Sequence, residues 1–331
     1  MSRLLVVEGL SVRIGAAEPV KALSFSVGAG ETVAIVGESG SGKSLTALAL
    51  MALLPRHAQA KGSIRLGGRE LLSLEERAMR EVRGREVAMI FQEPMTSLNP
   101  VVSVGRQIVE ALQTHEHLSR RAVRARAIEL LDLVRIPDPR RRAADFPHQL
   151  SGGMRQRVMI AMAVACRPKL LIADEPTTAL DVTIQAQVLD LLDTLRRELG
   201  MSLLLITHDL GVVAQWADKV VVMYAGRKVE QALPDALFGA PLHPYTRGLL
   251  SASPRLKAGY TYRDGPLNEI PGSIVSAKGE KGCPFRPRCA VARPSCAGFE
   301  PELLPFAPDR LVACAFPPTF VGGEIVAPLG L

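Results

Sequence analysis

Aromatic side chains, long apolar runs and cysteines are all scarce over most of this 331-residue sequence. Phe, Trp and Tyr together make up only 4% of the residues, which argues against a surface that binds single-stranded nucleic acid by base stacking. The longest apolar runs, Ala47–Leu54 and Val158–Cys166, fall far short of the roughly 20 residues that span a bilayer. The N-terminus reaches Glu8 before any apolar stretch long enough for a signal peptide. We therefore expect a cytoplasmic protein whose link to a membrane goes through a partner.

The charge of the chain is compatible with several kinds of partner. A net charge of +7 fits nucleic acid, an anionic membrane surface or a nucleotide. The basic residues are spread along predicted helices and through the loop Arg140–Arg142, so a solvated face is the better interpretation. Apolar residues make up 47% and charged residues 22%, as in an ordinary globular protein with one large or two smaller domains.

A complete P-loop is the first motif that carries chemistry. Its residues are Gly37, Glu38, Ser39, Gly40, Ser41, Gly42, Lys43 and Ser44. The apolar run Thr32–Val36 before it predicts a buried strand, and a helix is predicted after it, up to about Leu54. In this arrangement backbone N–H groups and the helix N-terminus bind phosphates, and glycines let the backbone curl close to the anion. Lys43 is expected to reach the β- and γ-phosphates of a nucleotide, and Ser44 to bind Mg²⁺.

An acidic pair closes another apolar run. Asp174 and Glu175 follow the predicted strand Leu170–Ala173, and an acid at the carboxyl end of a strand lies where such sheets bind ligands. Asp174 is expected to hold Mg²⁺ through water, and Glu175 to orient and polarise the attacking water. The alternative, that Glu175 only caps the following turn, has less support in a chain with a P-loop.

Two polar residues end other predicted strands. His208 follows Ser202–Ile206, a strand expected to lie beside the one that ends at Asp174, so it is placed to hydrogen-bond the γ-phosphate, although a lone histidine is more often structural. Gln92 follows the apolar run 89–91 at the start of a helical segment. An amide there is placed to contact Mg²⁺ or water and to sense movement of that segment.

A second glycine-rich turn begins more than a hundred residues after the first and follows Leu150. It comprises Ser151, Gly152, Gly153 and Met154. Ser151 is suited to cap a helix from about Gly152 to Cys166, which leaves N–H groups at the helix start available for an anion. The two turns cannot serve the same nucleotide. Each therefore reads as half of a site that two chains complete together.

The coarse pattern predicts an α/β fold with a helical subdomain and a small C-terminal region. Residues of about 94–167 are predicted to be mostly helical, Val182–Leu199 to be a helix and Val220–Tyr224 a strand. From about residue 235 prolines punctuate the sequence and the periodicity fades. We expect a nucleotide-binding domain over residues 1–235 and a loop-rich region over residues 236–331, with little core of its own and a bound metal to compensate.

The ordered set of motifs resembles the nucleotide-binding subunit of an ABC transporter. In that family's terms, Walker A lies at Gly37–Ser44, the Q-loop at Gln92, the signature at Leu150–Gly153, Walker B at Leu170–Glu175, the D-loop at Ala179–Asp181 and the switch histidine at His208. The resemblance covers roughly the first 235 residues and implies a P-loop NTPase that hydrolyses ATP with Mg²⁺. It also implies that the signature residues meet the γ-phosphate held by a partner's P-loop, and that Asp181 reaches across the same interface.

The C-terminal part is similar to one branch of that family. His243–Thr246, Ile270–Gly272 and Cys283–Cys289 resemble the tail of di- and oligopeptide importer ATPases, and residues 91–100 and 173–183 are also similar to that branch. The resemblance implies an ATPase at the cytoplasmic face of the cell membrane, bound to two permease subunits that work with a solute-binding protein. Movement would reach the permeases through residues 92–100 and the helical subdomain.

The partner and the solute follow less directly from that resemblance. Such importers often pair two different ATPases, so the second ATPase subunit is expected to be a different chain. The branch includes importers of dipeptides, oligopeptides, nickel and glutathione, and the solute never touches this subunit.

Four of the five cysteines gather near the C-terminal end of the sequence. They are Cys283, Cys289, Cys296 and Cys314, separated by 5, 6 and 17 residues. In a reducing cytosol such a cluster favours a metal over disulfides. Structural zinc usually shows closer cysteine pairs, and branch members with this tail are associated with a [4Fe–4S] cluster. We therefore expect that cluster, with Zn²⁺ as the alternative and two disulfides after it, and with Arg286, Arg288 and Arg293 either offsetting the cluster's charge or lying on the surface.

Two other classes of function compete with the importer ATPase. A soluble ABC-type ATPase acting on nucleic acid or ribosomes would suit the basic charge, but the chain has no long coiled-coil insertion and its tail resembles the importers. A regulator that does not hydrolyse ATP is disfavoured by the intact Glu175 and His208. We expect no nucleic-acid partner.

Two residues depart from the family pattern. Met154 stands where glutamine is commoner, and a thioether loses the hydrogen bonds of an amide. Ile14 stands where the family usually has an aromatic side chain that stacks on adenine.

The isoleucine at position 14 predicts weak discrimination between bases. Stacking of a base on an aromatic ring contributes about 1–3 kcal/mol, and Ile14 cannot supply it. We expect ATP and GTP to bind with similar affinity in a titration of the purified chain, and a strong preference for ATP would contradict this prediction.

Overall fold

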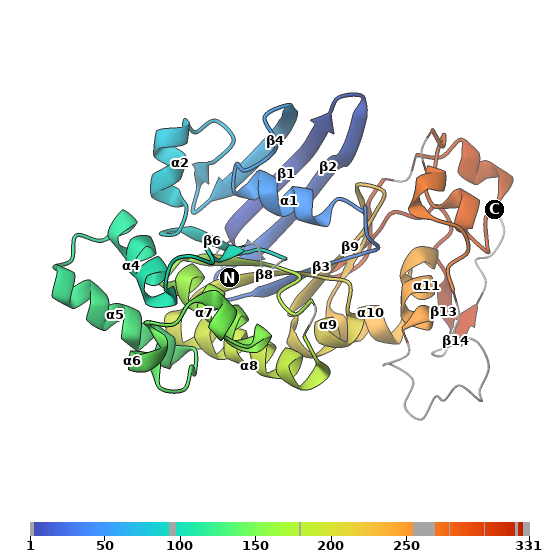
Figure 1. Ribbon diagram of the computed structural model, residues 1–331. Coiled ribbons are helices and arrows are strands. Elements are labelled where there is room, and N and C mark those ends of the chain that lie inside the picture. The colour runs from blue at the N-terminus through green and yellow to red at the C-terminus, as the bar shows by residue number, and fades with distance from the viewer. Residues whose placement is uncertain are drawn as a thin grey trace.

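The computed structural model describes residues 3–92, 97–178, 180–253, 269–277, 279–300, 302–321 and 324–326. Its first half, up to the end of the helical segment (Figure 1), contains β1 (Arg3–Ile14), β2 (Ala17–Gly28), β3 (Thr32–Val36), α1 (Lys43–Leu50), β4 (Ala58–Leu66), β5 (Arg69–Glu70), α2 (Glu76–Val82), β6 (Val87–Ile90), α4 (Val104–His115), α5 (Arg120–Leu133), α6 (Pro139–Arg142) and α7 (Gly152–Val164). The rest contains β7 (Leu170–Asp174), α8 (Val182–Leu199), β8 (Ser202–Thr207), α9 (Leu210–Trp216), β9 (Lys219–Tyr224), β10 (Arg227–Ala232), α10 (Pro234–Gly239), α11 (Pro244–Ala252), β11 (Leu304–Ala307), β12 (Arg310–Val312), β13 (Thr319–Val321) and β14 (Glu324–Val326).

An eight-stranded sheet forms the centre of the molecule, in the order β11-β12-β10-β9-β3-β8-β7-β6. The five strands from β9 to β6 in that order are parallel to their neighbours, and the other pairings are antiparallel. The strands predicted at Thr32–Val36, Leu170–Ala173 and Ser202–Ile206 are all present, and β8 lies beside β7 as expected. The sheet is that of a P-loop α/β protein.

The central strands are apolar along their whole length because both faces of the sheet are covered. In β7, Leu171 and Ala173 belong to one buried cluster, whereas Leu170 and Ile172 belong to another. Successive side chains of a strand point to opposite faces, so a strand buried on both sides reads as an unbroken apolar run. This is why the sequence alone located these strands.

A four-stranded antiparallel sheet, ordered β2-β1-β4-β5, covers one face together with α1. The strands predicted at residues 4–10 and 23–27 are longer in the structure, and β4, β5 and α2 were not predicted. Most of β4 is exposed or half-buried, so it gives no sustained apolar pattern. The helix expected to reach Leu54 ends at Leu50, where Ala52 takes a left-handed backbone conformation with φ of 50°.

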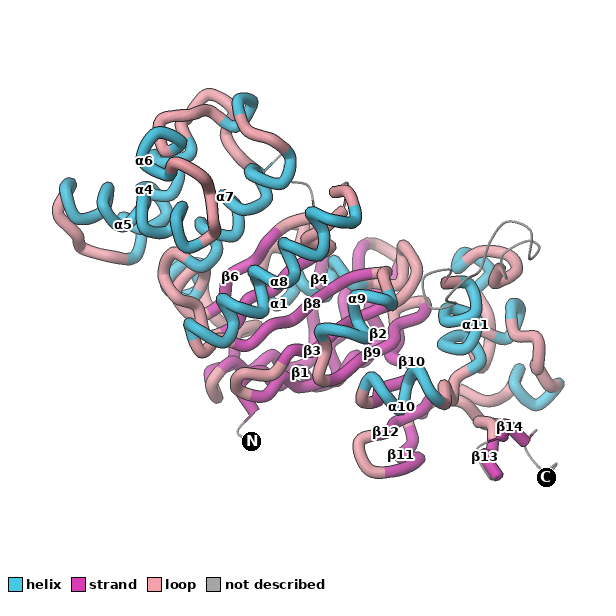
Figure 2. The backbone as a smooth tube through the Cα atoms, turned by 90° about the horizontal axis from the view of Figure 1, so that it is seen from below, coloured by secondary structure: helices cyan, strands magenta, loops and turns pink. Residues whose placement is uncertain are grey.

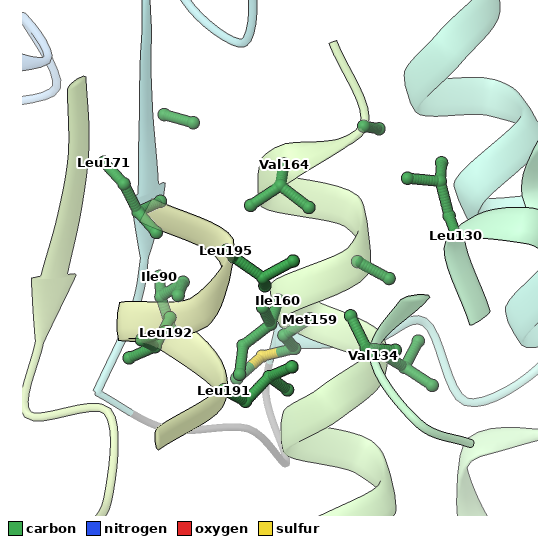
Figure 3. Close-up of a cluster of buried hydrophobic side chains, with 14 of the residues drawn as sticks. Ile90, Leu130, Val134, Met159, Ile160, Val164, Leu171, Leu191, Leu192 and Leu195 are labelled. Carbon is green, nitrogen blue, oxygen red and sulfur yellow. The ribbon is translucent and has the colours of Figure 1, made fainter. Parts of the chain in front are cut away.

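A helical segment, α4 to α7, follows β6 at one edge of the central sheet (Figure 1). Figure 3 shows how it is held: Ile160 and Val164 of α7 lie between Val134 on one side and Leu192 and Leu195 of α8 on the other. All of these side chains are buried. The segment corresponds to the helical subdomain expected at residues 94–167, although its first three residues lie outside the described part of the chain.

The C-terminal region joins the opposite edge of the same sheet (Figures 1 and 2). Strand β12 pairs with β10, so the tail extends the central sheet. The rings of Tyr224, Tyr245 and Phe285 contact one another, with centroids 4.7 to 5.4 Å apart. The apolar residues of the tail, including those of α11, pack in one cluster with residues of β3, β9 and β10. The domain boundary near residue 235 remains a prediction.

None of the helices in the described ranges combines the length and the hydropathy needed to cross a bilayer.

The shared aromatic core predicts that the tail and the sheet unfold together. Phe285 is 3% exposed, so Phe285→Ala should lower the free energy of unfolding by about 3–5 kcal/mol, as removal of a buried aromatic ring usually does. Urea denaturation followed by both far-ultraviolet dichroism and tyrosine fluorescence measures the effect, with Val291→Ala, at a position 56% exposed, as the control. A separate early transition confined to the tail would contradict this coupling.

Candidate functional site

Four segments meet at one edge of the central sheet because the strands that carry them are parallel neighbours. The order β3, β8, β7, β6 brings together the carboxyl ends of all four strands. The P-loop follows β3, His208 follows β8, Asp174 ends β7 and Gln92 lies two residues past β6. The structure thus gathers at one edge every residue that the sequence proposed for the chemical step.

The P-loop has the backbone geometry of an anion cradle. Gly40 and Gly42 have φ of 81° and 101°, which side chains other than glycine rarely tolerate. A Cβ atom on Gly42 would lie 2.5 Å from the carbonyl oxygen of Pro19. Helix α1 starts at Lys43 without a side-chain cap, so the N–H groups of its first turn remain available for an anion. The buried hydroxyl of Ser41 has no hydrogen-bond partner among the described residues.

Lys43 and Ser44 lie between the loop and the acid at the end of β7. The ammonium of Lys43 donates to the carbonyl oxygens of Gly37 and Glu38, at 2.7 and 3.0 Å. Burial lowers the pKa of Lys43, against the attraction of the nearby carboxylates. The Ser44 hydroxyl donates to Asp174 Oδ1 at 3.2 Å. Burial raises the pKa of Asp174, because removal from water disfavours the charged form of a carboxylate.

Glu175 is held by three side chains from three segments. Gln92 Nε2 lies 3.0 Å and the Thr178 hydroxyl 2.9 Å from its Oε2, while His208 Nδ1 lies 3.2 Å from its Oε1. Burial alone would raise the pKa of Glu175, but the hydrogen bonds from His208 and Thr178 bring it below its ordinary value. Its backbone has φ of 48°, a costly conformation for a residue with a side chain. The carboxylate therefore stays ionised and fixed in direction.

The second glycine-rich turn forms another group, together with the start of α8. Ser151 caps α7 as predicted, accepting a hydrogen bond from the Met154 N–H at 3.3 Å, although the helix ends at Val164. Asp181 caps α8 by accepting from the Ile184 N–H at 2.9 Å. The two helix starts touch, since a Cβ atom on Gly153 would lie 2.8 Å from Ile184. Ser151, Gly152 and Asp181 are exposed.

The four tail cysteines line one cavity of about 30 Å³, which also contacts His243 and Phe316. The four are Cys283, Cys289, Cys296 and Cys314. All are free, which contradicts the disulfide alternative. Burial raises the pKa of Cys283 and Cys289, and that of Cys314 to about 11.

The predicted metal-binding region is not confirmed by this arrangement. Over the described ranges, no group of three or more His, Cys, Asp and Glu residues is placed to hold a metal ion. Of the three arginines expected nearby, Arg288 instead binds Glu38, Arg286 pairs with Glu280, and Arg293 lies over the Phe316 ring.

Sequence reasoning missed three residues that contact the site. Thr178 lies three positions after Glu175, and its hydroxyl donates to the Glu175 carboxylate. This short spacing was the one signal in the sequence that pointed to the contact. Tyr245 and Arg288 contact Glu38 from the C-terminal region. Contacts across more than 200 positions leave no local pattern, so nothing in the sequence pointed to these two.

Comparison with known proteins identifies matches over most of the chain. A family model described as "ABC transporter" matches residues 20–178. A second, described as "Oligopeptide/dipeptide transporter, C-terminal region", matches residues 229–296. The second range includes the first three tail cysteines and ends before Cys314.

Named relatives match this chain over most of the length of both proteins. The chain is 53% identical to the probable peptide ABC transporter ATP-binding protein y4tR of Sinorhizobium fredii, over 88% of this chain and 87% of that protein. It is 50% identical to the oligopeptide transport ATP-binding protein OppD of Salmonella typhimurium, over 90% and 88% of the two chains.

Solved structures with the same fold include two ATP-binding cassettes. CbiO1 from Clostridium perfringens, part of the ABC transporter complex cbiONQ, has a TM-score of 0.64 and 27% identity, over 72% of this chain and 91% of that chain. A dimeric post-hydrolysis form of the cassette MJ0796, bound to ADP and Pi, has a TM-score of 0.61 and 25% identity, over 70% and 98%.

Proposed function

This chain belongs to the ABC transporter family, and we propose that it is the ATP-binding and ATP-hydrolysing subunit of an importer of di- or oligopeptides. The peptide assignment is supported by the match over residues 229–296 and by relatives named as peptide transport proteins. These favour the importer over a soluble ATPase that acts on nucleic acid or ribosomes.

The observation that carries the ATPase assignment is the placement of Glu175. Its carboxylate is ionised, fixed by Gln92, Thr178 and His208, and lies at the same sheet edge as the Ser44–Asp174 pair. A general base must be ionised and must point at the proton that it accepts. The ionised carboxylate of Glu175, held in one direction beside the P-loop, supports this role.

The residues at this edge fit magnesium-ATP. The N–H groups of the P-loop and the unpartnered Ser41 hydroxyl would bind the phosphates, and Lys43 would leave the loop carbonyls for the β- and γ-phosphates. Ser44, Asp174 and Gln92 are the residues that would hold Mg²⁺, directly or through water. Mg²⁺ supplies charge neutralisation between the phosphates. The donor set, hydroxyl, carboxylate and amide oxygens, is the one this ion prefers.

Glu175 then accepts a proton from the attacking water. His208 orients Glu175 and is placed to donate to the γ-phosphate oxygens, while Gln92 links the carboxylate to the helical segment that follows β6. Movement of that segment would therefore change the position of Gln92 relative to Glu175. This connects hydrolysis to mechanical movement.

The second glycine-rich turn serves the ATP of a partner ATPase, expected to be a different chain. The signature residues Ser151, Gly152, Gly153 and Met154, with Asp181, lie at the exposed N-terminal ends of α7 and α8. Val182 beside them is 65% exposed, an apolar side chain suited to burial against another chain. N–H groups at the start of α7 would face the γ-phosphate across the interface.

Permease subunits would dock on the side of the helical segment. An apolar cavity of about 230 Å³ is lined by Met89, Phe91, Leu98 and Met162 among others, so it lies between β6 and the helical segment. Phe91 is 41% exposed there. A subunit held in this way is peripheral, at the cytoplasmic face of the membrane, and its permeases receive peptide from a solute-binding protein.

The four tail cysteines are proposed to hold a [4Fe–4S] cluster, with Zn²⁺ as the alternative. Four thiols around one cavity are the complete donor set for either. A bound cation would stabilise the thiolates that ligate it. The bound group would then tie together three turns and β12's C-terminal end.

Metal content of the anaerobically purified chain decides between these groups. A cluster gives a brown protein with broad absorbance near 400 nm and about four iron atoms per chain, whereas zinc gives a colourless one with a single ion. Substitution of Cys289 by Ser should remove most of the metal, and substitution of Cys166, which lies outside the cavity, should not. A metal-free wild-type protein that is fully folded would contradict both assignments.

Glu175→Gln should abolish turnover while preserving nucleotide binding. Loss of a general base lowers the rate by about 10²–10⁴-fold, and glutamine keeps the shape of the side chain. ATP hydrolysis and equilibrium binding of ATP are measured on the same preparation, with Glu198→Gln, at an exposed position of α8, as the matched control. Hydrolysis at the wild-type rate in Glu175→Gln would exclude the proposed base.

The importer assignment itself is tested by affinity capture from membranes. The tagged chain should co-purify with apolar permease subunits, a second ATPase and a solute-binding protein, all identified by mass spectrometry. Capture of nucleic acid or ribosomal proteins in their place would support the competing function.

A further inference from the structure

Glu38, the second residue of the P-loop, is bound by an arginine from the far end of the chain. Arg288 donates to both carboxylate oxygens of Glu38, from Nη1 at 2.9 Å and from Nη2 at 3.1 Å. The Arg288 side chain is only 4% exposed and that of Glu38 is 27% exposed. A two-pronged arginine–carboxylate pair of this burial is strong and fixes direction as well as distance.

Arg288 is itself fixed by the tail. Its Nε donates to the carbonyl oxygen of Pro271 at 2.7 Å, and Nη2 also donates to that of Ile270 at 3.3 Å. Its guanidinium lies 5.8 Å from the centre of the Tyr224 ring, at the end of β9. The arginine therefore has no freedom to follow the P-loop, and the P-loop must conform to it.

The tail holds the backbone of the loop at two further points. The Glu38 N–H donates to the hydroxyl of Tyr245 at 2.8 Å. A Cβ atom on Gly40 would lie 3.6 Å from Ile274, so a tail side chain reaches the tip of the loop. The Glu38 carbonyl oxygen accepts from Lys43, so Glu38 links the tail directly to the lysine of the cradle.

The charge of Glu38 makes this contact matter for nucleotide binding. A carboxylate on the P-loop repels a triphosphate, because like charges at such short range are weakly screened when partly buried. Arg288 cancels that charge without approaching the cradle itself. The same contact holds the loop backbone from outside, which leaves its inward-facing N–H groups free.

We propose that Arg288 is a positioning residue of the ATP site, which acts through Glu38 to hold the P-loop open for the phosphates and to neutralise the loop's one carboxylate. This rests on the proposed function, since it assumes that the P-loop binds ATP. The tail is then part of the nucleotide site of its own chain, in addition to any role of its cysteines.

The test is a double-mutant cycle on nucleotide affinity in the full-length chain. Arg288→Ala should weaken the binding of magnesium-ATP by about tenfold, because it leaves a partly buried carboxylate unpaired beside the phosphates. Glu38→Gln alone gives the reference affinity for the second side of the cycle. In the Glu38→Gln background, Arg288→Ala should have less than about a threefold effect, since the charge that it neutralises is gone.

Controls separate a positioning role from a merely structural one. Arg286→Ala, in the same short turn but paired with Glu280, should leave affinity unchanged. In the assembled transporter, Arg288→Ala should raise KM for ATP with kcat nearly constant. If Arg288→Ala folds poorly, as urea denaturation would reveal, Arg288→Gln provides the same comparison, since it also removes the positive charge and keeps more of the side chain's volume.

The outcomes are distinct. Wild-type affinity in Arg288→Ala, or a loss of affinity that Glu38→Gln does not reduce, overturns the proposal. Failure of the wild-type chain to bind ATP at all would instead contradict the proposed function.

Discussion

The arrangement of the site depends on a sheet that is buried on both faces. Strands β3, β8, β7 and β6 can be apolar along their whole length only because α1 and the four-stranded sheet cover one face and the α7–α8 pair the other. Polar groups are excluded from such strands and are first admitted where each strand ends. Parallel pairing places those ends side by side. The clustering of Ser44, Asp174, Glu175 and His208 is a direct consequence of that burial.

Glu175 shows how rigid such an edge can be. Its backbone is held in a left-handed conformation, which costs free energy and persists only where the surroundings determine it. Gln92, Thr178 and His208 supply that determination, and each comes from a different segment. A shift in any one of these segments changes the direction of the carboxylate. The backbone strain at Glu175 and the sensitivity of its carboxylate to movement are therefore both linked to these three contacts.

Local patterns in the sequence were enough to locate the site residues at the strand ends, but not to predict the contacts that the tail makes with the P-loop. Asp174 and His208 could be located because each ends an apolar run, and Ser151 because a serine before two glycines caps a helix. Strand β4 was missed because most of it is exposed or half-buried and Gly62 interrupts its alternation, and Arg288 because its partner lies 250 positions away. The four cysteines do converge on one cavity, although they are spread over 32 positions of the sequence.

The long sequence separation between Glu38 and Arg288 also has a consequence during synthesis of the chain. A chain leaves the ribosome from its N-terminus, so the P-loop emerges about 250 residues before the arginine that holds it. Until β12 and the turn at Arg288 have been made, the loop lacks both its counter-charge and the hydroxyl of Tyr245, which itself appears more than 200 residues after Glu38. If Arg288 positions the P-loop as proposed, a chain truncated before residue 288 would carry every motif of the ATP site and would lack the arginine that neutralises Glu38.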